Sequence, residues 1–181
     1  IKCQAQTAVC APLNSTVRRH YVTFNCATCG GVHEGLPHLG FRWPDPYFAV
    51  PEMERDTRVV GTTDTCVIDD EAFYIRGVIL IPIIDAQDSF GIGAWVSQKR
   101  ANYQTYLENF ESSEIGPFFG WLSNRVPFYE PDTFGMKSMA RFQGSGQRPL
   151  IELEPSDHPL YLAQSQGLTI DRAWQLAHEY L

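Results

Sequence analysis

The sequence has no uninterrupted apolar run of the about 18 residues that a membrane-spanning helix requires. Hydrophobic residues make up 44% of the 181 positions, aromatic residues 13% and charged residues 19%. This is the composition of a globular protein with a buried core. A chain of this length hides roughly 70% of its unfolded surface when it folds. We therefore expect a soluble protein without a membrane partner.

Basic residues are also scarce. The chain has 14 Lys and Arg against 21 Asp and Glu, which gives a net charge of −7 and a pI near 5.1. Proteins that bind nucleic acid without regard to sequence need clustered Lys and Arg, because these side chains displace counterions from the phosphates. The acidic balance therefore argues against a nucleic-acid partner. It is common in bacterial cytoplasmic proteins, and we expect a cytoplasmic protein.

A secretion signal and a complete set of cysteine pairs are missing as well. The first fifteen residues lack a positively charged start followed by an apolar run. The five cysteines cannot all pair within one chain, so at least one thiol stays free or binds something, which fits a reducing compartment. Because Ile1 is not a start residue, we expect residues 1–20 to be an extension, whether fragmentary, processed or artificial. Residues 21–181 would form a single domain.

The common catalytic motifs are absent too. The sequence contains no G-x-S-x-G nucleophile elbow, no phosphate-binding G-x-x-x-x-G-K-[ST] loop and no zinc-binding H-E-x-x-H pair. The Gly91-Ile92-Gly93 stretch lacks the third glycine and the strand-to-helix setting of a dinucleotide-binding loop. These absences favour a binding or regulatory module over an enzyme.

The middle of the chain has the pattern of two paired strands. Apolar and β-branched residues run over 73–84, and in 90–96 every second residue from Phe90 onward is apolar. We expect the two strands to pair antiparallel through a turn at 85–89. A further short strand is expected at 150–153.

Helices are expected around these strands. Residues 98–112 have apolar side chains at helical spacing, and Ser97 offers an N-cap. Pro159 suits the first position of a short helix that Gly167 ends, and Thr169 caps the last helix. The predicted fold class is α+β, with a mainly antiparallel sheet, flanking helices and an N-terminal Cys-x-x-Cys knuckle.

That knuckle is the strongest chemical motif in the sequence. Cys26 and Cys29 are followed by a glycine, which lets backbone N–H groups point at the thiolate sulfurs of a zinc site. His33 lies four residues further on and is a first-choice third ligand. A thioredoxin-like redox role is less favoured, because two glycines after Cys29 oppose the helix that would lower a thiol pKa.

The rest of the zinc site has to come from elsewhere in the chain. A closed structural zinc site takes four ligands, and the sequence has no second Cys-x-x-Cys. Cys66 is the preferred fourth ligand because it lies in a polar segment just before a strand, and His158 and Asp64 come next. The alternative is that Cys26 and Cys29 are unliganded thiols in a tight turn.

Two polar groups offer weaker candidate sites. Arg76 lies in an apolar strand, so it needs carboxylate partners, and Glu52, Asp69 or Asp70 could supply them. Such a cluster could bind a small molecule, although a structural ion pair or an outward-facing Arg76 is the simpler interpretation.

The second group is Ser156-Asp157-His158, at a predicted helix start. Asp157 could orient His158 as a general base, but Ser156 or Asp157 is more simply an N-cap.

Five short motifs occur in one order along the chain. They are Cys26-Ala-Thr-Cys29-Gly-x-x-His33-x-Gly35-Leu-Pro, Val50-Pro-Glu52-x-Glu-Arg55, Asp64-Thr-Cys66-Val-Ile-Asp69 with Phe73-Tyr-Ile-Arg76-Gly77, Trp95-Val-Ser97, and Arg148-Pro-x-Ile-x-Leu-Glu154-Pro-x-Asp157-His158-Pro-Leu. In these motifs the sequence resembles the bacterial domain-of-unknown-function family 2199 over roughly residues 24–181. The resemblance implies an uncharacterised prokaryotic protein of about this size, a family for which no activity or substrate is established.

Three functions remain open at this point. The leading one is a structural zinc-binding module with a binding or regulatory role, in contact with a partner protein or a second copy of itself. The second is a metal-dependent hydrolase with an open zinc position, whose cleft would gather His33, Asp64, Arg76, Asp157 and His158. The third is a protein that neutralises a partner, which predicts an exposed apolar or acidic patch and no pocket.

Overall fold

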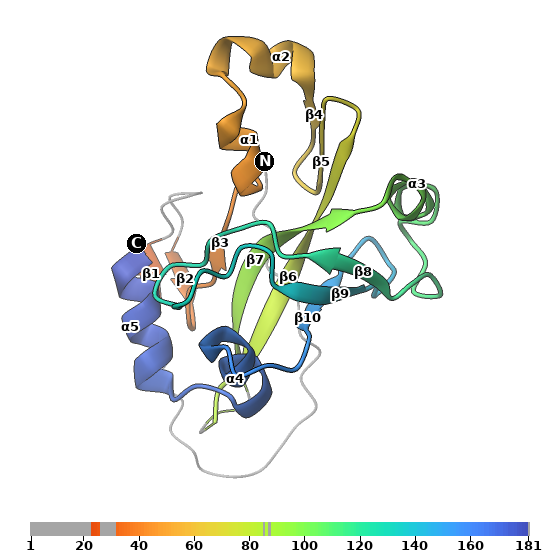
Figure 1. The fold of residues 1–181 in the computed structure, drawn as a ribbon. Helices are drawn as coiled ribbons and strands as arrows, with labels where there is room; N and C mark the ends of the chain where they lie inside the picture. The colour runs from red at the N-terminus through yellow and green to blue at the C-terminus, as the bar shows by residue number, and fades with distance from the viewer. Residues whose placement is uncertain (1–22, 26–31, 85, 87, 181) are drawn as a thin grey trace.

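The computed structural model describes residues 23–25, 32–84, 86 and 88–180. Its centre is a long antiparallel hairpin of β6 (Ala72–Pro82) and β7 (Ser89–Gln98), in register from the Phe73/Gln98 pair to the Pro82/Ser89 pair. Every second side chain on each strand points into the main core. The expected hairpin is confirmed (Figure 1). The expected extension at residues 1–20 lies outside the described residues.

The remaining strands build a mixed sheet on this hairpin. In the described part of the chain the sheet has eight strands, with the order β3-β7-β6-β10-β9-β8 and with β5 and β4 branching from β6. The bounds are β3 (Leu39–Gly40), β4 (Val59–Gly61), β5 (Thr65–Ile68), β8 (Phe118–Trp121), β9 (Lys137–Arg141) and β10 (Leu150–Leu153). The strand predicted at 150–153 is confirmed as β10.

The α+β class is confirmed, but the sheet is not as antiparallel as expected. β3 pairs parallel with β7, and β10 pairs parallel with β6, while the other pairings in this sheet are antiparallel. Parallel partners cannot be joined by a tight turn, so they come from distant segments. A local sequence pattern does not indicate pairing between strands that are far apart in the chain. The predicted Cys-x-x-Cys knuckle lies outside the described residues.

The sheet curls until β8, at the end of the strand order, meets β7. Val96 and Leu122 form an antiparallel bridge, and Ser123 N donates to Trp95 O at 2.7 Å. The main core lies within this curl. Its fully buried members (0% exposed) are Ile75, Ile79, Ile81, Phe90, Ile92, Ala94, Val96, Leu122, Ala140 and Leu160, together with Ala173 and Ala177 of the last helix.

Three longer helices cover the sheet: α3 (Arg100–Glu108), α4 (Pro159–Gln166) and α5 (Ile170–Tyr180). α3 is shorter than the 98–112 expected, and Ser97 is not its cap. The hydroxyl of Ser97 instead accepts a hydrogen bond from Trp121 N, which ties β7 to β8. Pro159, Gly167 and Thr169 mark the helix ends as predicted, and Thr169 Oγ1 accepts from Arg172 N at 3.3 Å.

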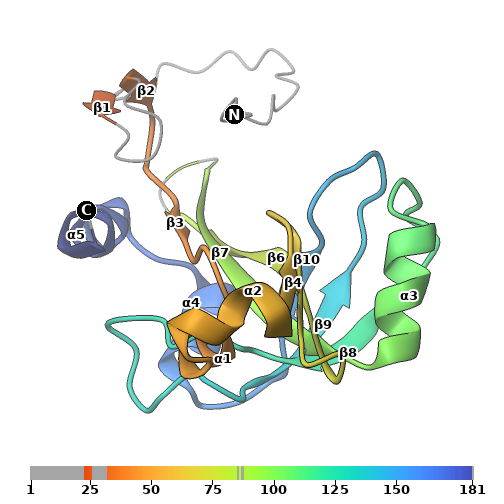
Figure 2. The same ribbon diagram turned by 90° about the horizontal axis from the view of Figure 1, so that it is seen from above.

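A smaller core lies on the outer face of the sheet, under an arm that projects from the domain (Figures 1 and 2). The arm comprises α1 (Asp45–Ala49), the 3-10 turn η1 (Glu52–Glu54), α2 (Arg55–Arg58) and β4. The smaller core consists of Val50, Cys66, Ile68, Tyr74 and Trp95. A side chain at Gly61 would collide with the Trp43 ring, since a Cβ there would lie 2.5 Å from it. Glycine therefore lets β4 close over this tryptophan.

Two further strands, β1 (Thr23–Asn25) and β2 (Val32–Glu34), pair antiparallel as a separate two-stranded sheet. In Figure 2 this small sheet stands apart from the larger one. Among the described residues, no helix has both the length and the apolar character needed to cross a membrane.

Candidate functional site

The residues predicted to bind zinc fall largely outside the described structure. Cys26 and Cys29 are not among the described residues. The backbone of His33 belongs to β2, but its side chain is not described. The zinc site therefore stays a prediction. Among the side chains that the structure describes, no three His, Cys, Asp or Glu residues come together in a way that could hold a metal ion.

Cys66 lies on β5 and is fully buried in the smaller core. It is a free thiol, surrounded by Ile68, Tyr74 and Trp95. Burial raises the pKa of the Cys66 thiol to about 11, because removal from water disfavours the thiolate. In these surroundings the group is a protonated, packed thiol, and binding a metal would require the charge of the ion to reverse that preference.

His158 and its neighbours form a helix start. The Nδ1 atom of His158 accepts from Leu160 N at 3.0 Å. The Nε2 atom lies 2.7 Å from Pro131 O, so it is the nitrogen that donates. His158 itself is thus the N-cap of α4, in place of the expected Ser156 or Asp157. With both ring nitrogens engaged, His158 also anchors the loop that contains Pro131.

Arg76 does not meet the carboxylates proposed for it. Its Nη1 atom approaches Thr63 O at 3.4 Å, and its backbone N donates to Asp64 O. Asp64 itself pairs with Arg148, with 2.5 Å between Oδ1 and Nε. This salt bridge lies where β5 and β10 both reach the same edge of β6, and it joins the two strands there.

Asp69 and Asp70 occupy the turn between β5 and β6 with φ of 55° and 53°, a left-handed conformation that Asp tolerates. Arg58 donates two hydrogen bonds to Asp69, at 2.7 and 2.6 Å. This bidentate contact lowers the pKa of the Asp69 carboxyl. Asp70 pairs with Arg100 at 3.0 Å. The two acids therefore hold a turn in place, and Glu52 is exposed on the arm.

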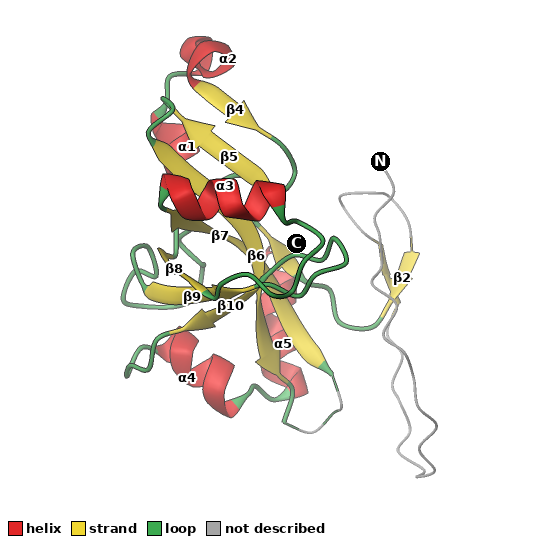
Figure 3. Cartoon of the chain, turned by 90° about the vertical axis from the view of Figure 1, so that its right-hand side faces the viewer, coloured by secondary structure: helices red, strands yellow, loops and turns green. Residues whose placement is uncertain are grey.

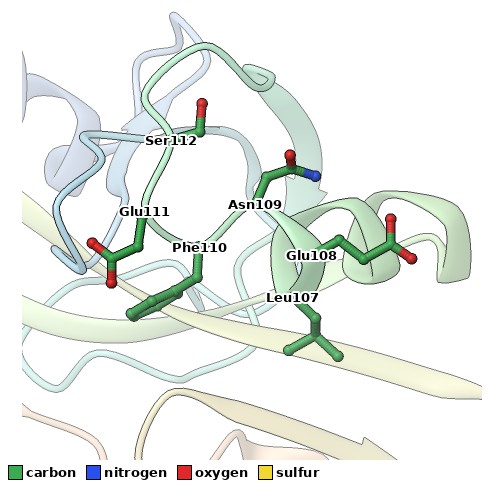
Figure 4. A pocket seen from close by; sticks show the side chains of 6 residues that line it. All are labelled: Leu107, Glu108, Asn109, Phe110, Glu111 and Ser112. Carbon is green, nitrogen blue, oxygen red and sulfur yellow. The ribbon is translucent and has the colours of Figure 1, made fainter.

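A shallow hollow lies at the C-terminal end of α3 (Figure 4). It is lined by six consecutive residues, Leu107–Ser112. Figure 4 shows the carboxylates of Glu108 and Glu111 pointing to different sides of this segment. A paired acid and base are therefore not brought together here, and the hollow does not resemble an active site.

The most elaborate polar structure is one that the sequence did not indicate, the loop at residues 122–136. Its centre is Asn124, which is fully buried. Asn124 Oδ1 accepts from Trp95 N at 2.8 Å, and Nδ2 donates to Trp43 O at 2.9 Å and to Asp45 Oδ1 at 3.0 Å. One side chain thus joins the loop to β7 and to the base of the arm.

Two more residues fix the same loop. Thr133 is 1% exposed; its hydroxyl donates to Asn124 O at 2.9 Å and accepts from Val126 N at 2.7 Å. Arg125 pairs with Asp45 at 3.0 Å and with Asp132 at 2.8 Å, and these carboxylates raise the pKa of the Arg125 guanidinium, Asp45 most of all. A network with this many internal partners holds the loop in one conformation.

This rigid loop and the neighbouring strand β8 present four aromatic side chains to solvent. They are Phe119 (37% exposed), Trp121 (45%), Phe128 (41%) and Phe134 (40%), and we call them the aromatic surface. The rings of Phe119 and Trp121 meet edge to face at 5.2 Å. The loop returns beside β8 through the hydrogen bond from Gly135 N to Leu122 O, which brings Phe134 to the strand end that carries Trp121.

Two local features accompany this exposure, one at Phe128 and one at Phe134. Phe128 has a φ of 71°, which costs a bulky residue about 1–3 kcal/mol and is maintained only where the surroundings enforce it. The Arg125 guanidinium lies 4.7 Å from the centroid of the Phe134 ring, a cation–π contact that fixes the ring outside the core. The only hint in the sequence is that aromatic residues and prolines alternate closely in 126–134, and that pattern does not separate exposed from buried rings.

These observations define an α+β domain whose curled mixed sheet carries an aromatic loop and an arm. The family model described as "Uncharacterized protein conserved in bacteria (DUF2199)" matches residues 25–168. The chain belongs to this family, as its motifs predicted. No curated protein and no solved structure matches it.

Proposed function

We propose that this protein is a bacterial cytoplasmic binding module whose aromatic surface docks onto a partner protein. The observation that carries the proposal is the contrast between the exposed rings and the rigid loop that holds them. Aromatic residues and arginine dominate the binding energy of protein interfaces. Here four exposed rings and Arg125 lie within residues 119–134.

The rigidity of the loop matters because a flexible loop would have to become ordered when the partner binds, which weakens binding. Fixing the backbone of one free residue costs about 1–2 kcal/mol, and a preorganised surface avoids that cost. The hydrogen bonds of Asn124 and Thr133 have already ordered the loop. Their side chains lie behind the surface, so they would remain in place when a partner binds.

The charges around the aromatic surface specify the partner further. Arg125 is neutralised by Asp45 and Asp132, while Glu130 is exposed in the same loop. The chain as a whole carries a net charge of −7. We therefore expect a partner surface with an apolar patch and a rim of Lys or Arg, since complementary charge speeds association and suppresses wrong partners.

A structural zinc ion is the second part of the proposal. Cys26 and Cys29 would supply two thiolates, with His33 and Cys66 as the remaining ligands. What supports this part is the Cys-x-x-Cys-Gly turn together with an imidazole four residues later. The ion would stabilise the N-terminal part of the domain and would take no part in chemistry.

Site-specific photocrosslinking tests the docking surface. A benzoylphenylalanine replaces Trp121 or Phe134 in the full chain, and Leu107, which is 51% exposed on α3, is the control position. We expect one partner to crosslink from positions 121 and 134 and not from 107. The partner is then identified and purified, and its binding to the unmodified chain is measured. Crosslinking from 107 alone, or no binding by the purified protein, would contradict the proposal.

A further inference from the structure

The short strand β3 joins the N-terminal part of the chain to the large sheet. It pairs with β7 through two residues, Leu39 opposite Ile92 and Gly40 opposite Gly93. The strand β2, which precedes it in the chain, belongs to a separate sheet and stands apart from the larger one (Figure 3). The contacts around β3 therefore matter for how this part of the chain is held.

One of these contacts comes from a histidine side chain. The Nδ1 atom of His38 accepts a hydrogen bond from Gly91 N at 2.7 Å, directly before the backbone pairs of β3 and β7. A Cβ at Gly91 would lie 2.7 Å from the same Nδ1 atom, so glycine is what lets the ring come this close to the strand. Just after β3, Phe41 N donates to Gly93 O at 2.8 Å. An imidazole thus holds one end of β3, and a backbone hydrogen bond holds the other.

The hydrogen bond to His38 requires a neutral imidazole. The Nδ1 atom can accept from Gly91 N only while it carries no proton, so the proton of the neutral ring lies on Nε2. A second proton on the ring would have to go to Nδ1, where its N–H would face the N–H of Gly91. Solvent reaches the residue, so protons have access to the ring.

The surroundings of the ring favour the neutral form. Packing against the strand removes part of the water around the imidazole and lowers the pKa of His38, while the carboxylate of Asp88, just before β7, opposes this by raising it. From β6, the Arg76 side chain reaches the same face of β7, since its Nη2 atom would lie 3.6 Å from a Cβ at Gly93. That cation does not favour a second one on the ring. His38 is therefore neutral at pH 7 and gains a proton only below the ordinary His value of about 6.5.

We propose that His38 is a pH-sensitive clasp, which holds β3 on β7 at neutral pH and loosens this strand at acid pH. Protonation replaces the hydrogen bond to Gly91 by two opposed N–H groups. The strand then keeps its backbone pairs and the buried side chain of Leu39, and it separates from β7 more often. The clasp is a regulatory device beyond the docking function, and it does not rest on the aromatic surface.

The sign of the effect follows from the lowered pKa of His38. Between that lowered value and about 6.5, the chain with β3 released binds more protons than the chain with β3 in place. The attachment of β3 is therefore strongest above about pH 6.5, and it weakens as the pH falls toward the lowered value.

Hydrogen exchange of two amides, followed by NMR on the full chain, tests the clasp. The Gly91 amide reports the hydrogen bond to His38, and the Phe41 amide reports the attachment of β3. Both are measured at about pH 8 and about pH 5, on either side of the histidine range, and each rate is divided by the intrinsic exchange rate at that pH. The loss of one hydrogen bond changes an opening equilibrium about fivefold. We therefore expect the protection of both amides to fall about fivefold or more at the lower pH.

Three variants separate His38 from the other titrating groups. In His38→Asn the side-chain oxygen can replace Nδ1 as the acceptor but does not titrate, so the protection of both amides should not depend on pH. His178→Asn removes an exposed histidine on α5 and should respond to acid as the wild type does. Asp88→Asn removes the carboxylate that favours the protonated ring, so its loss of protection should occur at a lower pH.

Three results would overturn the proposal. Unchanged protection of Gly91 at the lower pH would mean that the hydrogen bond survives. Loss of protection at Gly91 with Phe41 fully protected would mean that His38 does not hold β3. An equal acid response of His38→Asn and the wild type would assign the effect to other groups. The test compares two pH values for each variant, so it stays decisive even if His38→Asn is less protected at both.

Discussion

Replacing Asn124 by alanine should destabilise the protein far more than the loss of one exposed hydrogen bond. The substitution leaves Trp95 N and Trp43 O without their partners, and Asn124 is fully buried. Each unsatisfied buried group costs about 1–3 kcal/mol. We therefore expect a loss of about 3 kcal/mol, which lowers the melting temperature by roughly 6–12 °C for a chain of this size.

Urea unfolding followed by tryptophan fluorescence measures this loss, with Asn109→Ala as the control. Asn109 is exposed and makes one side-chain hydrogen bond, to Thr105 O at 2.9 Å, so its substitution should cost about 0.5 kcal/mol. Asn124→Asp should also be destabilising, because it removes the donor to Trp43 O and places a second carboxylate beside Asp45. One hydrogen bond typically contributes about 1 kcal/mol. If the free energies of unfolding of Asn124→Ala and Asn109→Ala differ by less than about this amount, the loop does not depend on this network.

Three further outcomes are expected. Purified protein should contain stoichiometric zinc by elemental analysis, and Cys26→Ser should lose the metal and melt earlier; zinc-free protein whose melting temperature Cys26→Ser leaves unchanged would refute the site. Cys66→Ala tests whether the buried thiol is a zinc ligand or only part of the smaller core. If Cys66 is a ligand, the variant should contain less zinc; a variant that retains its zinc would show that Cys66 is not a ligand. Arg58 lowers the pKa of Asp69, so the pair stabilises the fold above the ordinary Asp pKa of about 3.9, and this stabilisation is lost as the pH falls through the lowered value. We therefore expect the Arg58→Ala variant to be less stable than the wild type at pH 7 and nearly as stable as the wild type at acid pH. An equal difference in stability at both pH values would contradict this.

The sequence predicted the elements whose pattern is local. The alternation from Phe90 onward gave the hairpin, and Pro159 and Gly167 gave the bounds of α4. Features that depend on distant segments were missed. β3 and β10 pair parallel with strands far away in the chain, and the hydroxyl of Ser97 was expected to cap a helix but accepts a hydrogen bond from β8.

The candidate sites divide in the same way. The Cys-x-x-Cys motif is visible in the sequence because its residues are neighbours, whereas the aromatic surface depends on Asn124, which reaches 81 positions back to Trp43. The carboxylates considered for Arg76 illustrate a related limit. Asp69 and Asp70 occupy a tight turn, and that turn aims them at Arg58 and Arg100.

The most direct test of the central claim is the dissociation constant of the purified crosslinked partner for Trp121→Ala, compared with Leu107→Ala. Truncating a hot-spot aromatic residue costs about 2 kcal/mol or more, which is roughly a 30-fold loss of affinity. We expect that loss for Trp121→Ala and a change below about twofold for Leu107→Ala, with the melting temperatures of both variants close to that of the wild type. Equal affinity of Trp121→Ala and the wild type would contradict the proposal that the aromatic surface is where the partner binds.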